Sequence, residues 1–193
     1  MRTAVIDRRT AETDIHCELN LDGKGDTRIS TGIGFFDHMM TLMAFHGRMD
    51  LVLKADGDLD VDDHHTIEDC GIVLGQAFKQ ALGERKGIAR YGSFTLPMDE
   101  SLASVNLDIS GRPYLVFNCE FSRDSIGMMA TEMVEEFMRA FAFNAGITLH
   151  INLHYGNNDH HKAEAVFKAL GHALNGAIAQ NSDVLMSTKG MLE

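Results

Sequence analysis

Residues 64–78 read HHTIEDCGIVLGQAF, and residues 160–174 read HHKAEAVFKALGHAL. Both stretches place His-His-x-x-Glu at the start of an amphipathic helix, and the second follows the first by 96 residues. Upstream, DHMMTLMAFHG (37–47) aligns with EEFMRAFAFNAG (135–146) with a one-residue gap. A repeat of this kind predicts a duplicated α/β unit whose halves sit back to back around a pseudo-two-fold axis. Chance similarity between two amphipathic helices is the alternative explanation.

Short strands and helices alternate along the rest of the chain. Residues 12–21 alternate apolar and polar side chains, as a half-buried strand does, and Asp22-Gly23 predicts a hairpin turn into a second short strand. Residues 35–46 carry apolar side chains at helical spacing, with Gly47 as the C-cap. The other predicted elements are strands at 1–10, 49–55, 90–97, 101–109, 113–119 and 147–153, and helices near 66–82, 130–145 and 160–179. Without a Ser/Gly-rich linker, we expect 1–193 to be a single domain of two repeats, about 1–90 and 91–180, plus a C-terminal tail.

Composition excludes several classes of protein. The chain has 193 residues, 45% of them hydrophobic, which suits a globular fold with a core of its own. Its net charge of −11 argues against nucleic-acid binding through backbone electrostatics. No apolar run approaches 18 residues, so no membrane contact is expected. Three cysteines without a CxxC spacing predict reduced thiols in a cytoplasmic protein.

The ten histidines include both His-His pairs, and these point to a metal. On a helix, Glu68 shares a face with His64 or His65, whereas the two adjacent histidines diverge and can serve two different ions. Imidazole and carboxylate without thiolate suit Mn, Fe, Zn or Ni, and open coordination positions favour Mn or Fe(II). A solvated surface pair is the alternative for either His-His sequence taken alone.

The repeat also predicts further ligands, because His38 aligns with Glu136 one turn into the preceding helix. Whether one subunit or several complete each site stays open at this point. The candidate metal ligands are His38, His64, His65, Glu68, Glu136, His160, His161 and Glu164.

Other polar positions give weaker signals. Asp58, Asp60 and Asp62 are spaced like the start of an EF-hand, but Asp63 and Asp69 stand where that loop needs Gly and Glu, which favours a solvated acidic loop. We expect structural roles for His16, His150 and His172. The basic residues Arg90, Arg112 and Lys189 stand where the chain turns, where they could bind an anion or form surface ion pairs. Two more residues follow candidate ligands at helical spacing, namely His46 after His38 and Lys168 after Glu164.

Several motifs together resemble one family. They are GFFDHM (34–39), DDHHTIEDCG (62–71), RYG (90–92), SGRPYL (110–115), LHINLHYGNNDHHKAEAVFKA (149–169) and STKG (187–190). The chain resembles imidazoleglycerol-phosphate dehydratase of histidine biosynthesis over essentially its whole length. Nothing in it resembles the fused phosphatase domain of some members, so we expect the monofunctional form.

The resemblance implies a lyase that converts D-erythro-imidazole-glycerol phosphate to imidazole-acetol phosphate with two Mn(2+) per active site. It implies that the metals bind the substrate imidazole as imidazolate, which expels the C3 hydroxyl before the C2 proton is lost. Glu12 matches the family's catalytic acid-base carboxylate. The substrate-binding residues carried over are Glu12, His46, Arg90, Arg112, Lys168, Ser187 and Lys189.

The implied fold is α+β, an internally duplicated β-α unit like domain 2 of ribosomal protein S5, with helices packed on one face of each sheet. The implied assembly is a homo-oligomer of 24 subunits with active sites shared between neighbours. Two positions depart from the family pattern: Leu42 replaces a Gln that contacts substrate, and Glu136 stands where many members have His. A metal-dependent hydrolase and a non-catalytic metal-binding assembly protein are the alternative functions.

Overall fold

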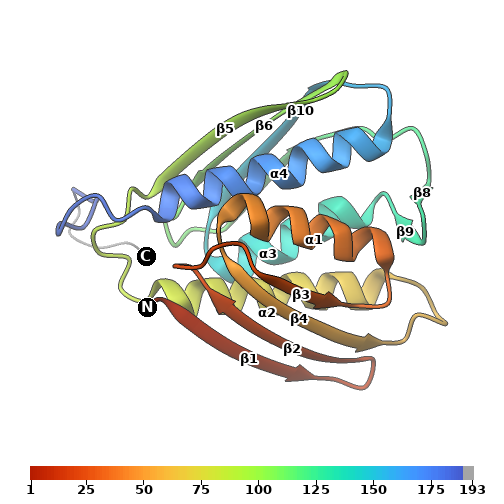
Figure 1. Ribbon diagram of the computed structural model, residues 1–193, viewed down its shortest axis with the longest axis horizontal. Helices are drawn as coiled ribbons and strands as arrows, with labels where there is room; N and C mark the ends of the chain where they lie inside the picture. The colour runs from red at the N-terminus through yellow and green to blue at the C-terminus, as the bar shows by residue number, and fades with distance from the viewer. Residues whose placement is uncertain (189–193) are drawn as a thin grey trace.

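Several of the predicted strands alternate buried and exposed side chains, and eight strands pair into two four-stranded sheets whose strands are arranged in the same order. The computed structural model describes residues 1–188 (Figure 1). The first half contains β1 (Thr3–Arg9), β2 (Thr13–Asn20), β3 (Thr27–Ser30), α1 (Gly34–Gly47), β4 (Asp50–Gly57) and α2 (His64–Leu82). The second contains β5 (Tyr91–Met98), β6 (Ser101–Asp108), β7 (Tyr114–Asn118), α3 (Met133–Ala145), β10 (Thr148–Tyr155) and α4 (Asp159–Ile178). The duplicated β-α unit is therefore confirmed.

The sheet orders are β1-β2-β4-β3 and β5-β6-β10-β7, so the halves share one topology. In each sheet the first three strands in this order pair antiparallel and the last pairs parallel. The predicted hairpin at Asp22-Gly23 is wrong, because β3 pairs with β4 and not with β2. The carboxylate of Asp50 accepts backbone N–H groups from Lys24, Gly25 and Asp26 at 2.7–3.2 Å, which carries the loop across the start of β4.

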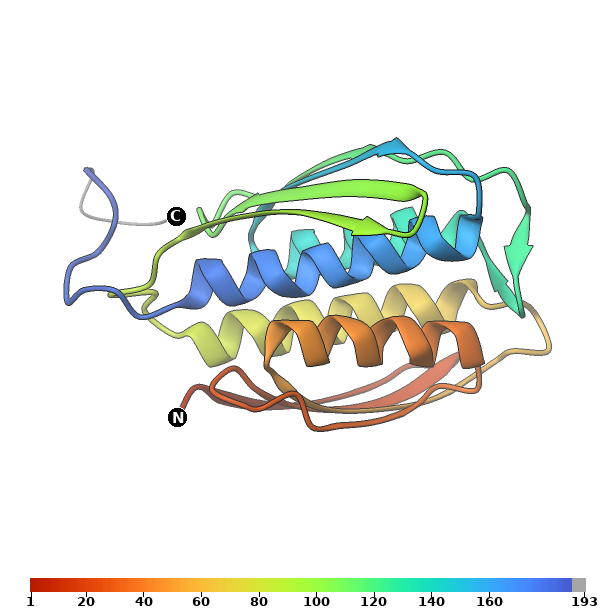
Figure 2. The same ribbon diagram turned by 45° about the horizontal axis from the view of Figure 1, so that its top comes forward.

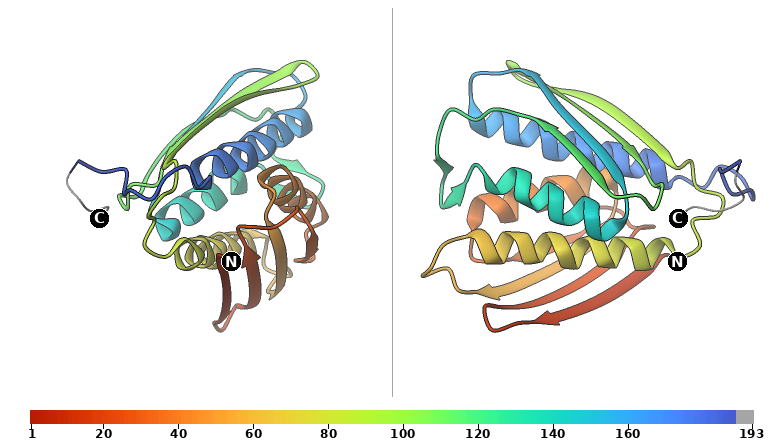
Figure 3. Two further views of the ribbon diagram at one scale, coloured as in Figure 1. Left: turned by 60° about the vertical axis from the view of Figure 1, so that its left-hand side comes forward. Right: turned by 180° about the vertical axis from the view of Figure 1, so that it is seen from behind.

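The four helices lie between the two sheets (Figure 2). Helices α1 and α2 cover one face of the first sheet, α3 and α4 cover one face of the second, and the helices meet back to back as α1 on α4 and α2 on α3 (Figure 3). The core includes five fully buried phenylalanines, namely Phe36, Phe78, Phe137, Phe141 and Phe167. The predicted packing of helices on one face of each sheet is confirmed.

Glycine allows the helices to approach this closely. A Cβ on Gly171 of α4 would lie 2.4 Å from the carbonyl oxygen of Met43 in α1. Its counterpart in the repeat, Gly75 of α2, would place a Cβ 2.7 Å from the carbonyl oxygen of Phe141 in α3. Both helix pairs therefore depend on a missing side chain at the same position of the repeat.

Two helix boundaries differ from the predictions. Gly47 is the last helical residue of α1, and Arg48 takes the left-handed C-cap conformation with φ of 54°. Helix α3 begins at Met133, because an insertion with the short strands β8 (Ser125–Ile126) and β9 (Met129–Ala130) precedes it. Alternation and helical periodicity did not signal this insertion, which is too short and irregular to repeat either pattern.

The insertion is tied to the starts of both His-His-x-x-Glu helices. The carboxylate of Asp63 accepts the backbone N–H of Ala130 at 2.7 Å. Buried Asp159 accepts the backbone N–H groups of Ser122 and Arg123, each at 2.8 Å. Within residues 1–188, no helix combines the length and apolar character needed to cross a membrane.

Candidate metal centre

Both His-His pairs open their helices in the same way. The side chain of Asp62 accepts the backbone N–H of His64 at 2.9 Å, and Asn158 accepts that of His160 at 2.9 Å. These contacts satisfy an N–H group that the helix itself leaves unpaired and so fix where each helix begins. The paired imidazole rings diverge, with interplanar angles of 82° in the first pair and 83° in the second. One ring of each pair can thus face an ion that its neighbour does not.

Helices α1 and α4 bring together His38, His160 and Glu164. The Oε1 atom of Glu164 lies 3.0 Å from Nε2 of His38 and 3.0 Å from Nε2 of His160. Ligand atoms of all three residues lie within 4.8 Å of one another. This group, the α1–α4 cluster, joins a residue of the first half to two of the second.

The electrostatics of the α1–α4 cluster favour an ionised carboxylate. Burial by itself raises the pKa of Glu164, but hydrogen bonds from Lys168, His38 and His160 outweigh it and lower the pKa to about 2. The Nζ atom of Lys168 lies 2.5 Å from Oε2 of Glu164. Two imidazoles and an ionised carboxylate form a nitrogen/oxygen donor set that fits a divalent ion such as Mn²⁺.

The repeat-related group is more open. In α2, Nε2 of His64 lies 3.7 Å from Oε2 of Glu68. Glu136 of α3 is turned toward Arg139, whose Nε lies 3.7 Å from its Oε2. Among the described residues, only the α1–α4 cluster has three ligand atoms this close together. His64, Glu68 and Glu136, which we call the α2–α3 set, are thus on facing helices without being drawn together.

The remaining members of the two pairs face away from these groups toward carboxylates. His65 has Nδ1 2.9 Å from Oδ2 of Asp58 and Nε2 3.9 Å from Oε1 of Glu12. The hydrogen bond to Asp58 raises the pKa of His65. The acidic spacing around Asp58 predicts a solvated loop and does not indicate this contact with His65.

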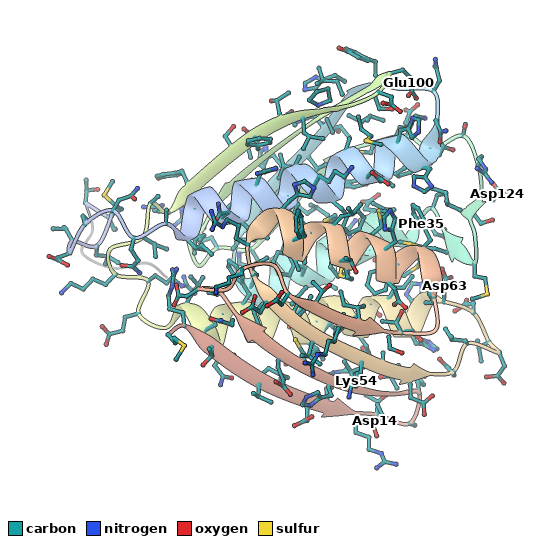
Figure 4. The ribbon with its side chains drawn as sticks, viewed as in Figure 1. Asp14, Phe35, Lys54, Asp63, Glu100 and Asp124 are labelled. Atoms are coloured by element: carbon teal, nitrogen blue, oxygen red, sulfur yellow. The ribbon has the colours of Figure 1, made fainter. Side chains whose placement is uncertain are left out.

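His161 has the equivalent arrangement with a different partner. Its Nδ1 lies 2.7 Å from Oε2 of Glu100, and this hydrogen bond raises the pKa of His161 and lowers that of Glu100. Its Nε2 lies 3.7 Å from Asp99. Sequence reasoning also missed Glu100, although the repeat carried a signal: Glu100 precedes β6 as Glu12 precedes β2. Figure 4 shows Glu100, Phe35 and Asp63 toward one end of the molecule, which we call the ligand end.

The predicted phosphate-binding residues lie at the other end. The backbone N–H of Arg90 donates to the carbonyl of Ala177 in the last turn of α4, about 25 Å along the helix from His160. The Arg90 guanidinium holds Asp108 at 2.7 and 3.0 Å and the carbonyl of Met186 at 2.6 Å. Ser187 follows Met186, and Lys189 lies outside the described residues. One chain therefore cannot bring Arg90 to its own α1–α4 cluster.

Arg112 lies at this same end, which we call the tail end. Its neighbour Gly111 donates a hydrogen bond to the carbonyl of Gly146, the C-cap of α3, at 2.9 Å. Arg112 itself is exposed. Arg90 and Arg112 therefore lie beside the C-termini of α4 and α3, and Figure 1 shows these helix ends opposite the helix N-termini near which the candidate ligands lie.

His46 lies between the two ends and has a partner that the sequence did not indicate. Its Nδ1 lies 3.1 Å from Nε2 of His172, whose ring stacks on Phe94 with centroids 4.1 Å apart. Burial lowers the pKa of both histidines. The stacking and the pairing give His172 the structural role expected of it and add a contact with a predicted substrate-binding residue.

The chain is similar to known proteins over almost its full length. The family model for imidazoleglycerol-phosphate dehydratase matches residues 31–174. An imidazoleglycerol-phosphate dehydratase of Acetivibrio thermocellus is 60% identical over 97% of each chain, and one of Clostridium botulinum (strain Hall) is 60% identical over 98% of this chain and 97% of its own. The crystal structure of the Staphylococcus aureus dehydratase has a TM-score of 0.85 at 42% identity, covering 93% of this chain and 99% of that one. The Pyrococcus furiosus enzyme, in complex with (S)-C348, has a TM-score of 0.84 at 36% identity, covering 97% and 100%.

Proposed function

The chain belongs to the imidazoleglycerol-phosphate dehydratase family, a hydro-lyase of histidine biosynthesis, and from this we propose that it dehydrates its substrate at a two-manganese site shared between subunits. The observation that carries the proposal is the α1–α4 cluster, where His38, His160 and Glu164 converge from two halves of the chain. A solvated surface pair would not draw a third ligand from another helix.

We assign each ion three residues of one chain and one histidine of a neighbouring subunit. The α1–α4 cluster would hold one ion, and the α2–α3 set would hold the other. The fourth ligands would be His65 and His161 of neighbouring subunits, because Asp58 and Glu100 hold these rings away from their own chain's clusters. When bound, Mn²⁺ supplies Lewis acidity that favours the anionic form of the substrate imidazole and thereby the loss of the C3 hydroxyl.

Glu12 would move the proton at C2 of the substrate. Its carboxylate lies 3.9 Å from Nε2 of His65, so it accompanies a predicted ligand to the shared site. The turn that carries Glu12 is fixed, since its N–H donates to Oγ1 of Thr10 and its carbonyl accepts the N–H of Asp58, both at 3.1 Å. The half-exposed Glu12 side chain can therefore reach a bound substrate without movement of the backbone.

Glu100, the counterpart of Glu12 in the second repeat, is already engaged in several hydrogen bonds. Glu100 accepts hydrogen bonds from His161 and from the backbone N–H groups of Asn157 and Asn158 at 2.7–3.1 Å. These contacts lower its pKa, so it is a poor acceptor for a further proton. This difference supports Glu12 as the acid-base residue of the pair.

Arg90, Arg112, Ser187 and Lys189 would bind the substrate phosphate, with His46 and Lys168 as further contacts. The separation of about 25 Å between Arg90 and His160 along α4 requires a neighbouring subunit to complete the site. We therefore propose a homo-oligomer, a 24-subunit shell as the family resemblance implies, in which bound metal joins ligands from different chains.

The deciding experiment is turnover of imidazoleglycerol phosphate by chelator-stripped protein, with and without added Mn²⁺. Activity that returns with Mn²⁺ supports the proposal. Metal uptake without turnover would point instead to a hydrolase or to a non-catalytic metal-binding assembly protein. Replacement of Arg90, Arg112 and Lys189 together should leave the bound Mn²⁺ unchanged and abolish turnover, and turnover at the parent rate would contradict the phosphate assignment.

A further inference from the structure

Each histidine that points away from its own cluster rests against a carboxylate through Nδ1. We propose that Asp58 and Glu100 are positioning residues, which hold His65 and His161 with Nδ1 protonated and Nε2 turned outward as the ligand atom for a divalent ion. The inference rests on the proposed metal centre and assigns roles to two residues that the sequence motifs left out. In metal sites generally, a carboxylate on the second ring nitrogen fixes the tautomer and makes the imidazole a better donor.

Asp58 is committed to this contact in the first half. Its Oδ2 lies 2.9 Å from Nδ1 of His65, and its backbone is tied to Glu12 and Val61 by hydrogen bonds of 3.1 and 2.8 Å. The other oxygen, Oδ1, is buried and has no hydrogen-bond partner among the described residues. Burying an unpaired carboxylate oxygen costs free energy, so the hydrogen bond between Oδ2 and His65 must help to hold Asp58 in this position.

Glu100 makes the same contact in the second half from another part of the repeat. It stands before β6, whereas Asp58 stands after β4, and the residue after β10 is Gly156. Duplication therefore did not copy the contact from one half to the other. Two different loops each supply a carboxylate to Nδ1 of equivalent histidines. This is expected when both histidines need the contact for the same function.

The outward nitrogens have no comparably short contact. Nε2 of His65 lies 3.9 Å from Glu12, and Nε2 of His161 lies 3.7 Å from Asp99, both beyond hydrogen-bond distance. A protonated Nδ1 held at 2.7–2.9 Å leaves the Nε2 lone pair available to an ion.

The test is Mn²⁺ affinity of the intact, assembled protein, measured from free Mn²⁺ by electron paramagnetic resonance. The variants Asp58→Ala and Glu100→Ala should each weaken one class of site by about 10- to 100-fold. Asp58→Asn and Glu100→Gln keep a neutral acceptor for Nδ1–H, so the loss should be smaller than in the matching alanine variant. Asp60→Asn removes one charge from an exposed position of the same loop as Asp58 and should bind Mn²⁺ like the parent.

A second readout separates positioning from general support of the fold. Ring ¹⁵N spectra of the metal-free protein should show His65 and His161 as Nδ1-protonated tautomers. In each alanine variant, the affected histidine should populate both the Nδ1- and the Nε2-protonated tautomers. Parent-like Mn²⁺ affinity in both alanine variants would overturn the inference, as would a lower melting temperature with unchanged affinity. If the parent itself takes up no Mn²⁺, the proposed function and the inference fail together, whereas loss of the positioning effect alone leaves the proposed function standing.

Discussion

At the scale of the residue, the surroundings of duplicated groups decide how each is used. Glu12 and Glu100 occupy equivalent turns, but only Glu100 is saturated with hydrogen bonds. His38 meets a carboxylate of α4, whereas Glu136 at the equivalent place is drawn toward Arg139. Equivalent positions have thus acquired different chemistry through the side chains around them.

Replacing Glu12 tests the acid-base assignment. Glu12→Gln keeps the size of the side chain but cannot exchange a proton, so kcat should fall by about 10²- to 10⁴-fold with bound Mn²⁺ unchanged. Steady-state turnover and metal analysis measure the two effects. Asp14→Asn is the matched control, because Asp14 is an exposed carboxylate near the same turn, and it should retain parent activity. A parent-like kcat for Glu12→Gln would remove Glu12 from the mechanism.

Acid should release the metal because protons compete for the imidazole ligands. The pKa values of His65 and His161 are raised, so these rings become protonated at a higher pH than an ordinary histidine of about 6.5. The apparent affinity for Mn²⁺ should therefore begin to weaken above about pH 6.5, and because bound Mn²⁺ opposes protonation of the rings, the ion should be released as pH falls below that value. Glu164, with its pKa lowered to about 2, stays ionised through this range and does not cause the loss. Full metal content at pH 4, measured after gel filtration, would contradict histidine ligation.

At the scale of the element, the pairing of α1 with α4 and of α2 with α3 creates the ligand groups. Each pair joins one helix from each half, so the α1–α4 cluster depends on how the halves dock. The close crossing is set by Gly171 and Gly75, the same position in the two repeats. Helix packing and the proposed metal ligation are therefore coupled.

A methyl group at the crossing of α1 and α4 should weaken the packing of these two helices. In Gly171→Ala, the new Cβ would meet backbone atoms of Met43 and Gly47, so the free energy of unfolding should fall by about 1–3 kcal/mol. Gly176→Ala on the same helix has open space and should be neutral or stabilise by about 0.5–1 kcal/mol. Urea unfolding of the metal-free proteins compares them. Equal stability of the two variants would show that the crossing tolerates the methyl group.

At the scale of the whole molecule, the chain separates two kinds of chemistry. The candidate metal ligands lie at the N-termini of the helices, and Arg90 and Arg112 lie at the C-terminal ends of α4 and α3. Because a helix is rigid over this length, one chain would present two parts of the proposed site rather than the complete site. A closed assembly in which neighbours meet end to end would bring the parts together.

Mixed oligomers test whether sites are shared. Subunits carrying Glu12→Gln and subunits carrying Glu164→Gln should each be inactive alone, yet co-expressed mixtures should regain activity, because some sites combine an intact Glu12 with an intact Glu164. Activity is measured on assemblies purified through a different tag on each subunit. A mixture of His38→Ala and Glu164→Gln is the control and should stay inactive, since both belong to the cluster of one chain. Failure of the first mixture would place Glu12 and Glu164 of each site on the same chain.

Local patterns were sufficient for most of the fold. Alternation of apolar and polar residues predicted β2, and helical spacing predicted α1 and α2. These predictions are possible because the residues that form one buried face recur at short, regular intervals in the sequence. The hairpin at Asp22-Gly23 was wrong because the pairing of β3 is decided by β4, far along the chain. The candidate ligands could likewise be found by their spacing, and the repeat places Glu100 at the position equivalent to Glu12, whereas Asp58 could not be recognised without the ring it contacts.

The sequence by itself determined the duplication, the order of the strands and helices outside the β8–β9 insertion, and the identity of the candidate ligands, since each depends on periodicity or on spacing that recurs in the two halves. Tertiary structure alone decided that His38 meets Glu164, that His65 and His161 face carboxylates, and that Arg90 lies far from the candidate ligands. The physical reason is that these contacts join side chains from different helices, strands and loops, in the case of His38 and Glu164 from the two halves of the chain. No short stretch of sequence contains that information in its own local pattern.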